Sequence, residues 1–409
     1  MAKEYKDLVV GLDIGTSKIM VVVAEVLPGG LLKIAGFGVS PSNGLKRGVV
    51  VNIDATVQSI QQALREAELM ADCKIGRVYT GITGSHIRGI NSSGMVAIKD
   101  KEVSRSDVRR VLDTATAINI SNDQRLLLVE SQEFVIDGQD VKDPIGMSGI
   151  RLEAKVHIVT GAQSAAENII KCVHRCGLEV EHLMLNPMAS SLAVLTNDER
   201  ELGVVLVDIG AGTTDVAVFT GGAIRHTAVI PIAGDLITSD IAMALRTPTK
   251  DAEEIKIDIG FAKQLLTDPD SQVEVPGLGD RGPRLLSKQA LAGVIEPRIE
   301  EIFTLVQQAI RETGYEEVLS SGIVLTGGAS VMPGMIELGE DIFLKPVRRG
   351  IPKYSGNLSD MVAQARASTV MGLLEEASLA RLRGMKVGHN NGSIKNTLSR
   401  AKDWLIGNF

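Results

Sequence analysis

Short apolar runs rich in Val and Ile alternate along the chain with longer stretches whose apolar residues recur every three or four positions. The short runs predict strands over residues 8–13, 18–25, 203–208, 215–220 and 322–326. The periodic stretches predict helices over residues 54–70, 104–117, 162–176, 289–313 and 368–383. Residues 8–12 and 204–207 are apolar at nearly every position, which favours strands buried on both faces of a sheet. This alternation is typical of a layered α/β protein.

One strand–turn–strand pattern occurs twice. It reads LVVGLDIGTSKIMVVVAEV near the start and GVVLVDIGAGTTDVAVFTGG about half the chain later. Each copy places an aspartate, Asp13 or Asp208, at the end of its first strand and follows it with a glycine-containing polar turn. A repeat at this separation predicts two related lobes that face one another.

Both turns have the composition of a phosphate-binding loop. Glycine lets the backbone approach an anion closely, and free N–H groups and hydroxyls bind its oxygens. The candidate residues are Asp13, Gly15, Thr16, Ser17 and Lys18 in the first turn and Asp208, Gly210, Gly212, Thr213 and Thr214 in the second. We expect Asp13 and Asp208 to hold Mg²⁺ through its water ligands. A plain tight hairpin explains either turn alone about as well, but the matched pair favours phosphate binding.

Other nucleotide-binding motifs are absent from the sequence. There is no Gly-x4-Gly-Lys-Ser/Thr, which argues against a P-loop nucleotidase. No Gly-x-Gly-x-x-Gly follows the first predicted strand, which disfavours a dinucleotide fold.

Five motifs, in order along the chain, are similar to those of the actin-like ATPase superfamily, which includes Hsp70 and the sugar kinases. They are the two phosphate motifs at 11–18 and 207–215, the connecting-helix motifs at 186–195 and 365–374, and the adenosine motif at 323–335. The resemblance implies a duplicated, ribonuclease H-like two-lobed fold that binds ATP and Mg²⁺ between its lobes. It adds to the candidate nucleotide contacts Glu253, Lys256, Gly327, Gly328, Ala329 and Met332. Small residues in the two connecting motifs would let two helices cross closely.

Within this superfamily the chain resembles the FtsA family of bacterial cell-division proteins, most clearly over 220–242 and 294–302. The resemblance implies an ATP-binding, self-assembling protein that anchors filaments of the tubulin-like FtsZ to the inner membrane. It places the protein on the cytoplasmic face of that membrane, at the division septum, where it helps recruit later division proteins.

The same resemblance implies how the chain is divided. The expected parts are a first lobe core at 1–83 completed by 164–202 and 363–383, an inserted subdomain at 84–163, a second lobe core at 203–238 and 305–362, a subdomain at 239–304, a linker at 384–393 and a terminal helix at 394–409. The insert is expected to contact other division proteins.

Asn186 stands where chaperone relatives carry the glutamate that orients the attacking water. An asparagine cannot act as a general base. We therefore expect at most slow ATP hydrolysis, with ATP acting mainly as a ligand that closes the two lobes.

The last segment predicts an amphipathic helix after the polar stretch GMKVGHNNGS. Its apolar face comprises Ile394, Leu398, Ala401, Trp404, Leu405 and Phe409, with Lys and Arg at its flanks. Such a helix is typical of binding to anionic lipid at a membrane surface. Packing of the helix on the protein's own core is the alternative.

Basic residues gather near the end of the charged stretch 239–304. The resemblance implies that Arg284 and Arg298 bind carboxylates of the acidic C-terminal tail of FtsZ. On pattern alone, these residues are a solvated helix face.

Composition narrows the remaining alternatives. The formal net charge of −7 argues against a nucleic-acid binder. MAKEYKDLVV lacks the features of a secretory signal, and three cysteines cannot all pair with one another, so a cytoplasmic protein is expected. Cys172 and Cys176 flank His174, but cysteines four apart on a helix are more often buried apolar groups than metal ligands. A sugar-type kinase of the same fold stays open, although no base for a substrate hydroxyl is evident. A chaperone-like ATPase would need a further peptide-binding domain.

Overall fold

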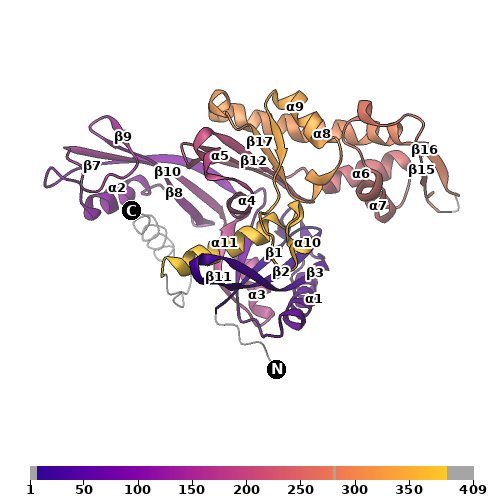
Figure 1. Cartoon of the computed structure of the whole chain (residues 1–409), viewed down its shortest axis with the longest axis horizontal. Coiled ribbons are helices and arrows are strands. Elements are labelled where there is room, and N and C mark those ends of the chain that lie inside the picture. The colour runs from indigo at the N-terminus through magenta and orange to yellow at the C-terminus, as the bar shows by residue number, and fades with distance from the viewer. Residues whose placement is uncertain (1–6, 280–281, 385–409) are drawn as a thin grey trace.

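Two five-stranded sheets form the centres of two lobes in the computed structural model, which describes residues 7–279 and 282–384 (Figure 1). The first-lobe sheet has the order β11-β6-β1-β2-β3. Its strands are β1 (Leu8–Ile14), β2 (Lys18–Val26), β3 (Leu32–Pro41), β6 (Arg77–Ile82) and β11 (Glu179–Leu185). The second-lobe sheet has the order β14-β13-β12-β17-β18. Its strands are β12 (Val204–Ile209), β13 (Thr214–Thr220), β14 (Ala223–Ile230), β17 (Ile323–Thr326) and β18 (Val347–Arg349).

The two sheets share one topology. In each, an antiparallel hairpin, β1–β2 or β12–β13, is followed by a parallel neighbour, β6 or β17, beside its first strand. Every residue of β12 is buried, and so is every residue of β1 except the first. Burial on both faces explains their nearly continuous apolar sequences. The predicted duplication and the actin-like fold class are confirmed.

Helices cover the first-lobe sheet. They are α1 (Ile53–Ala71), α3 (Gln163–Arg175), α4 (Asn186–Val194) and α11 (Ser368–Leu382). α4 and α11 cross as closely as their small residues allow, because a Cβ at Gly372 would lie 1.7 Å from the Ala189 carbonyl oxygen. Helix α1 begins where the Asn52 side chain accepts a hydrogen bond from the Ala55 N–H.

An insert leaves the first lobe after β6 and returns before α3. Its sheet has the order β7-β10-β8-β9, built from β7 (Arg88–Ala97), β8 (Gln124–Ile136), β9 (Gln139–Val141) and β10 (Arg151–Ala162). Helix α2 (Arg105–Ala115) packs on β7 and β10 over a separate hydrophobic core. Figure 1 shows the insert projecting to the left, away from the helices of the second lobe.

The second lobe carries a helical extension, on the right in Figure 1. It contains α6 (Gly234–Leu245), α7 (Thr249–Ile259), α8 (Lys288–Thr313) and the hairpin β15 (Gln272–Val275) with β16 (Arg284–Ser287). Helix α9 (Met335–Phe343) packs on α8 and β18. Shorter elements are β4 (Leu45–Lys46), β5 (Val49–Val50), α5 (Asn197–Leu202), α10 (Ser359–Val362) and the 3₁₀ turns η1 (Pro28–Gly30), η2 (Gln264–Leu266), η3 (Glu316–Val318), η4 (Gly328–Val331) and η5 (Ala365–Ala367).

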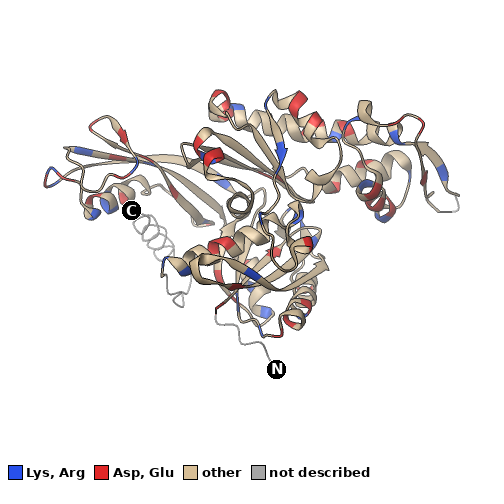
Figure 2. Ribbon diagram, viewed as in Figure 1, with Lys and Arg blue, Asp and Glu red and all other residues tan. Residues whose placement is uncertain are grey.

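The ten elements predicted from periodicity all form, with ends that differ by one or two residues. Figure 2 shows that the positions of Lys and Arg are interspersed with those of Asp and Glu along the ribbon of both lobes and of the insert. Within the two described ranges, no helix has the length and apolar content needed to cross a membrane. Apart from Gly384, the predicted linker at 384–393 lies outside the described residues, and so does the predicted helix at 394–409.

The insert also touches the second lobe, through the edge strand β14. The Gln132 side chain donates to the Ile224 carbonyl at 2.9 Å, and Arg225 forms an ion pair with Glu133 at 2.7 Å. His157 lies 3.0 Å from the Thr227 hydroxyl through Nε2. The insert is therefore joined to one lobe by the chain and to the other by polar contacts.

Candidate functional site

The two phosphate loops meet where the lobes face one another. A Cβ at Gly212 in the second loop would lie 2.5 Å from the Thr16 hydroxyl of the first. Each loop is closed by one backbone bond, from the Gly15 N–H to the Lys18 carbonyl and from the Gly210 N–H to the Thr213 carbonyl, at 3.0 and 2.9 Å. The two turns predicted from sequence thus lie together as one site.

Asp13 and Asp208 stand at the ends of β1 and β12, and both are buried. Lys18 pairs with Asp13, with the ammonium 3.3 Å from the carboxylate oxygen. Asp208 accepts hydrogen bonds from Ser190 on α4 and, at 3.4 Å, from Thr369 on α11. Burial raises the pKa of Asp208 to about 6; the Ser190 hydrogen bond opposes this, while the charge of Asp13 adds to it. A cation placed between these carboxylates would reverse the shift.

A third carboxylate, Asp215, belongs to the same site. It is the cross-strand partner of Asp208, and its side chain accepts a hydrogen bond from Thr83 at the end of β6 in the other lobe. Burial, and then the nearby charge of Asp208, raises the pKa of Asp215 to about 8. The bond from Thr83 joins the lobes directly beside the phosphate loops.

Not every hydroxyl predicted to face a phosphate is free to do so. The Thr214 hydroxyl donates to the Ile232 carbonyl at 2.8 Å, and the residue is fully buried. The Thr16 hydroxyl already accepts a bond from the Gly48 N–H at 3.0 Å. Ser17 is exposed at the tip of the first loop. Thr214 therefore supports the loop from beneath, whereas Thr16 and Ser17 lie at its surface.

The α6–α7–η4 wall (Gly234, Glu253, Lys256 and Gly327–Met332) adjoins the second loop. The Gly234 N–H donates to the Gly210 carbonyl at 3.1 Å, which ties the start of α6 to the loop. Gly327 has a φ of 87° and packs against Asp208, where a Cβ would lie 2.3 Å from a carboxylate oxygen. Only glycine fits this position, because it combines positive φ with close approach.

Lys256 ties the wall together. Its ammonium donates to Glu253 at 2.6 Å, to the Thr238 hydroxyl at 2.8 Å and to the Gly234 carbonyl at 3.1 Å. Both side chains predicted to reach the nucleoside are thus held in one network. Gly328 and Ala329 follow Gly327 at the start of η4, and Met332, which directly follows η4, is buried.

Asn186 opens α4 at the same junction. Its side chain is buried, and its Oδ1 atom has no hydrogen-bond partner among the described residues. A Cβ at Gly81, near the end of β6, would lie 2.2 Å from this oxygen. The amide therefore occupies the position at which the resemblance led us to expect an acid, and it supplies no base.

The residues expected to bind a partner lie on the helical extension, apart from the phosphate loops. Arg284 on β16 donates to the Leu245 carbonyl. Arg298 on α8 makes a two-pronged ion pair with Asp240, at 2.6 and 3.0 Å, and a further bond to Glu301. Both guanidinium groups have partners within the protein, which the sequence did not reveal.

The segment Cys172–Cys176 packs as part of α3. Cys172 is buried, and burial raises the pKa of the Cys176 thiol to about 11. Among the residues that the structure covers, no three His, Cys, Asp or Glu side chains are arranged to hold a metal ion. Cys172 lies in the hydrophobic core of the first lobe, and the Cys176 thiol lies 3.7 Å from the Val57 carbonyl oxygen of α1.

Comparisons with known proteins agree on one family. The model of "Cell division protein FtsA" matches residues 205–372, and that of "SHS2 domain inserted in FTSA" matches residues 84–160. The chain is 54% identical to the cell division protein FtsA of Pseudomonas aeruginosa, with 98% of each chain covered. It is 50% identical to that of Neisseria meningitidis, over 97% of this chain and 98% of the relative, and 44% identical to that of Escherichia coli, over 99% of each.

Solved structures show the fold alone. MreB5 of Spiroplasma citri bound to ADP has a TM-score of 0.57 at 14% identity, with 93% of this chain and 99% of that chain covered. The PilM–PilN type IV pilus biogenesis complex has a TM-score of 0.62 at 17% identity, with 90% of this chain and 98% of that chain covered. Both match the two-lobed architecture described above.

Proposed function

The chain belongs to the FtsA family of cell division proteins, and on this premise we propose that it binds ATP, assembles with itself and anchors FtsZ filaments to the cytoplasmic face of the inner membrane. The observation that carries the proposal is the meeting of two glycine-containing loops and three carboxylates, Asp13, Asp208 and Asp215, at the lobe junction. MreB5 of Spiroplasma citri, which shares this fold, is solved bound to ADP, and this supports nucleotide binding by a chain of this architecture.

In this proposal the phosphate loops hold the nucleotide. Backbone N–H groups and the hydroxyls of Thr16, Ser17 and Thr213 bind phosphate oxygens. Asp13 and Asp208 hold Mg²⁺ through its water ligands, and the ion neutralises part of the charge between them. The α6–α7–η4 wall receives the nucleoside, with the Glu253 carboxylate placed for the ribose and the Gly327–Gly328 backbone beside the base.

Nucleotide binding is proposed to act chiefly as a latch. Both lobes contribute to the site, so a bound nucleotide stabilises the closed arrangement by its contacts with each. With Asn186 in place of an acid, chemistry depends on positioning and on the metal alone. We expect a turnover below about 1 s⁻¹, at the low end of enzyme rates. A faster steady-state rate would contradict the latch.

The first test concerns the metal-binding carboxylate. Asp208→Asn should lower the affinity for Mg-ATP by about tenfold or more, because a charged group is removed from the ion's ligand shell. Asp258→Asn, at an exposed position on α7, is the matched control and should bind as the wild type does. If the wild type, Asp208→Asn and Asp258→Asn bind Mg-ATP with equal affinity in titration calorimetry, the assignment of the two loops as the phosphate site is refuted.

The helical extension is proposed to hold the acidic tail of FtsZ. Arg298 would bind the tail by exchanging or sharing its bonds to Asp240 and Glu301, so the affinity should be modest and salt-sensitive. Arg298→Glu should abolish binding of a synthetic tail peptide, whereas Arg311→Glu, near the end of the same helix, should not. Arg284→Glu tests the same surface and leaves the ion pair between Arg298 and Asp240 intact. Unchanged binding in both Arg284→Glu and Arg298→Glu would count against this surface.

Attachment to the septal membrane is proposed to rest on the terminal segment 394–409. The terminal segment of a single chain should bind anionic lipid weakly, whereas the segments of many chains joined in a filament gain avidity of about 10²–10⁴-fold. Filament formation on lipid monolayers should therefore need both ATP and residues 394–409. Filaments that form equally well on the lipid without this segment would refute the coupling. The insert is proposed to receive the later division proteins.

A further inference from the structure

A two-residue turn lies between the phosphate loops. It belongs to the hairpin of β4 and β5, in which Leu45 pairs with Val50 and Lys46 with Val49, so that Arg47 and Gly48 alone form the turn. Both have positive φ, 50° and 77°, as a type I′ turn requires. Asn-Gly is the preferred sequence for this turn, so Arg47 occupies a conformation that an arginine adopts at some cost.

The turn is fixed against both lobes. The Gly48 N–H donates to the Thr16 hydroxyl of the first loop at 3.0 Å. A Cβ at Gly48 would lie 3.0 Å from the Thr83 methyl group and 3.3 Å from the Thr213 methyl group. The Arg47 Cα itself lies 2.9 Å from where a Cβ would stand on Gly212 of the second loop. The backbone of the turn thus contacts both phosphate loops and Thr83.

Arg47 lies at the end of the site away from the nucleoside. The α6–α7–η4 wall meets the second loop at Asp208 and Gly210, and the start of α6 also bonds Ala211. Arg47 meets the same loop at the following residue, Gly212, next to Thr16 of the first loop. A triphosphate bound with its nucleoside at the wall would therefore extend along the loops toward Arg47.

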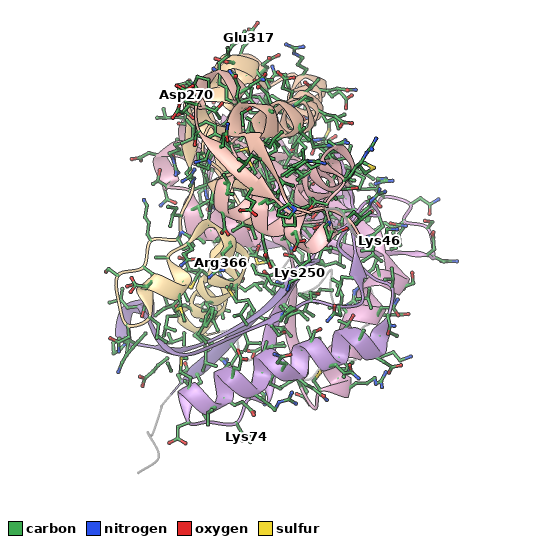
Figure 3. All side chains as sticks on the ribbon, turned by 90° about the vertical axis from the view of Figure 1, so that its right-hand side faces the viewer. Lys46, Lys74, Lys250, Asp270, Glu317 and Arg366 are labelled. Atoms are coloured by element: carbon green, nitrogen blue, oxygen red, sulfur yellow. The ribbon has the colours of Figure 1, made fainter. Side chains whose placement is uncertain are left out.

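The charge of Arg47 is available to a ligand. Its side chain is exposed while Gly48 beside it is buried, and no carboxylate in the described part of the chain pairs with it. Lys18, the nearest basic residue in the loops, is already paired with Asp13. Figure 3 shows its neighbour Lys46 at the height where the two lobes meet, as it does Lys250 and Arg366. A guanidinium group matches two phosphate oxygens at once, which a lysine cannot do.

We propose that Arg47 binds the terminal phosphate of the nucleoside triphosphate and so makes the protein distinguish ATP from ADP. The inference rests on the proposed nucleotide site. It adds to that site the residue that binds the terminal phosphate, which ATP has and ADP lacks. Because the turn carrying Arg47 touches both lobes, this contact forms only when the loops stand together around the triphosphate.

The test compares affinities for ATP and ADP in the presence of Mg²⁺, by titration calorimetry of the full chain. Arg47→Asn removes the guanidinium group and leaves Asn-Gly, the sequence that best suits the turn, so the fold should be at least as stable. We expect ATP affinity to fall by about 10- to 100-fold, the range for a lost charge-assisted hydrogen bond, and ADP affinity to change less than about twofold.

Lys46→Gln is the matched control, because it removes one positive charge from the same hairpin at the neighbouring position. It should leave both affinities within about twofold of the wild type, which separates a specific contact from a general loss of charge. Arg47→Lys should lie between the wild type and Arg47→Asn. Equal losses for ATP and ADP, or no loss for either, would overturn the proposal. Wild-type protein that binds neither nucleotide would overturn the nucleotide site, and this inference with it.

Discussion

Replacing Gly372 by alanine tests whether the crossing of α4 and α11 holds the phosphate site together. The added methyl would lie 1.7 Å from the Ala189 carbonyl oxygen, whereas an ordinary carbon–oxygen contact is about 3.4 Å. The two helices must therefore separate by roughly 1.5 Å, because the atom in the way is backbone and cannot rotate aside. Overpacking of this kind costs about 1–3 kcal/mol.

The separation also reaches Asp208. Its two hydroxyl donors sit on different helices, Ser190 on α4 and Thr369 on α11, so both bonds cannot survive a shift of this size. A lost hydrogen bond to a charged group adds about 1.5–3 kcal/mol. The free energy of unfolding should thus fall by about 3–5 kcal/mol in Gly372→Ala, a large part of the 5–15 kcal/mol typical of a folded protein.

Urea unfolding followed by far-ultraviolet circular dichroism measures this change, and titration with Mg-ATP measures the accompanying loss of affinity. Gly76→Ala is the matched control, since a Cβ at Gly76 meets nothing within 4 Å. It should unfold at the same urea concentration as the wild type or slightly above it, because alanine restricts the unfolded chain. A Gly372→Ala protein that unfolds together with Gly76→Ala would refute the close crossing and its link to Asp208.

Three further outcomes follow from the structure. Burial lowers the pKa of His157 to about 4 in the folded protein. As the pH falls from about 6.5 to 4, the histidine therefore binds a proton in the unfolded chain before it does so in the folded one, and the free energy of unfolding should fall by about 3 kcal/mol. His157→Gln should flatten that part of the curve measured by urea unfolding; an unchanged pH profile would contradict the buried neutral ring. Trp404→Glu should abolish co-sedimentation with anionic liposomes without shifting the unfolding midpoint, and full retention of binding would refute the anchor. Chelation of Mg²⁺ by EDTA should weaken ATP binding at least tenfold in calorimetry, since Asp13 and Asp208 would then repel the phosphates; equal affinity with and without EDTA would argue against a metal there.

The phosphate hairpins could be predicted from sequence because their strands are buried on both faces. β1 and β12 show continuous apolar runs, and the matched aspartates at their ends point to one site. The insert's sheet gave no such signal. Exposure alternates along β7, but its less exposed positions include Gly89, Ser92 and Gly94 while Ile90 and Met95 are exposed, so the apolar residues do not mark the buried face.

Residues that act across the junction could not be paired from sequence. Thr83 and Asp215 are distant in the chain, and only the packing of the lobes brings the hydroxyl to the carboxylate. Asp215 nevertheless had one local signal, since it is the register partner of Asp208 across the β12–β13 hairpin. Arg298 was correctly placed on a charged helix, but its pairing with Asp240 depends on how α8 packs against α6.

The contacts between the insert and β14 link the insert to the second lobe. Because the insert is also joined to the first lobe, the three parts of the molecule are connected in a closed ring. The insert, the first lobe and the second lobe each contact the other two, so a rotation of any one of them strains its contacts with the others. Between the insert and the second lobe, the Arg225–Glu133 ion pair, the Gln132 hydrogen bond and the His157–Thr227 contact are all non-covalent. These contacts lie beside Val156 in β10, five residues or about 17 Å from the outer end of the strand at Arg151, so a turn of about 5° there displaces that end by about 1.5 Å. When the lobes rotate by a small angle, the outer end of the insert therefore moves further than its base does.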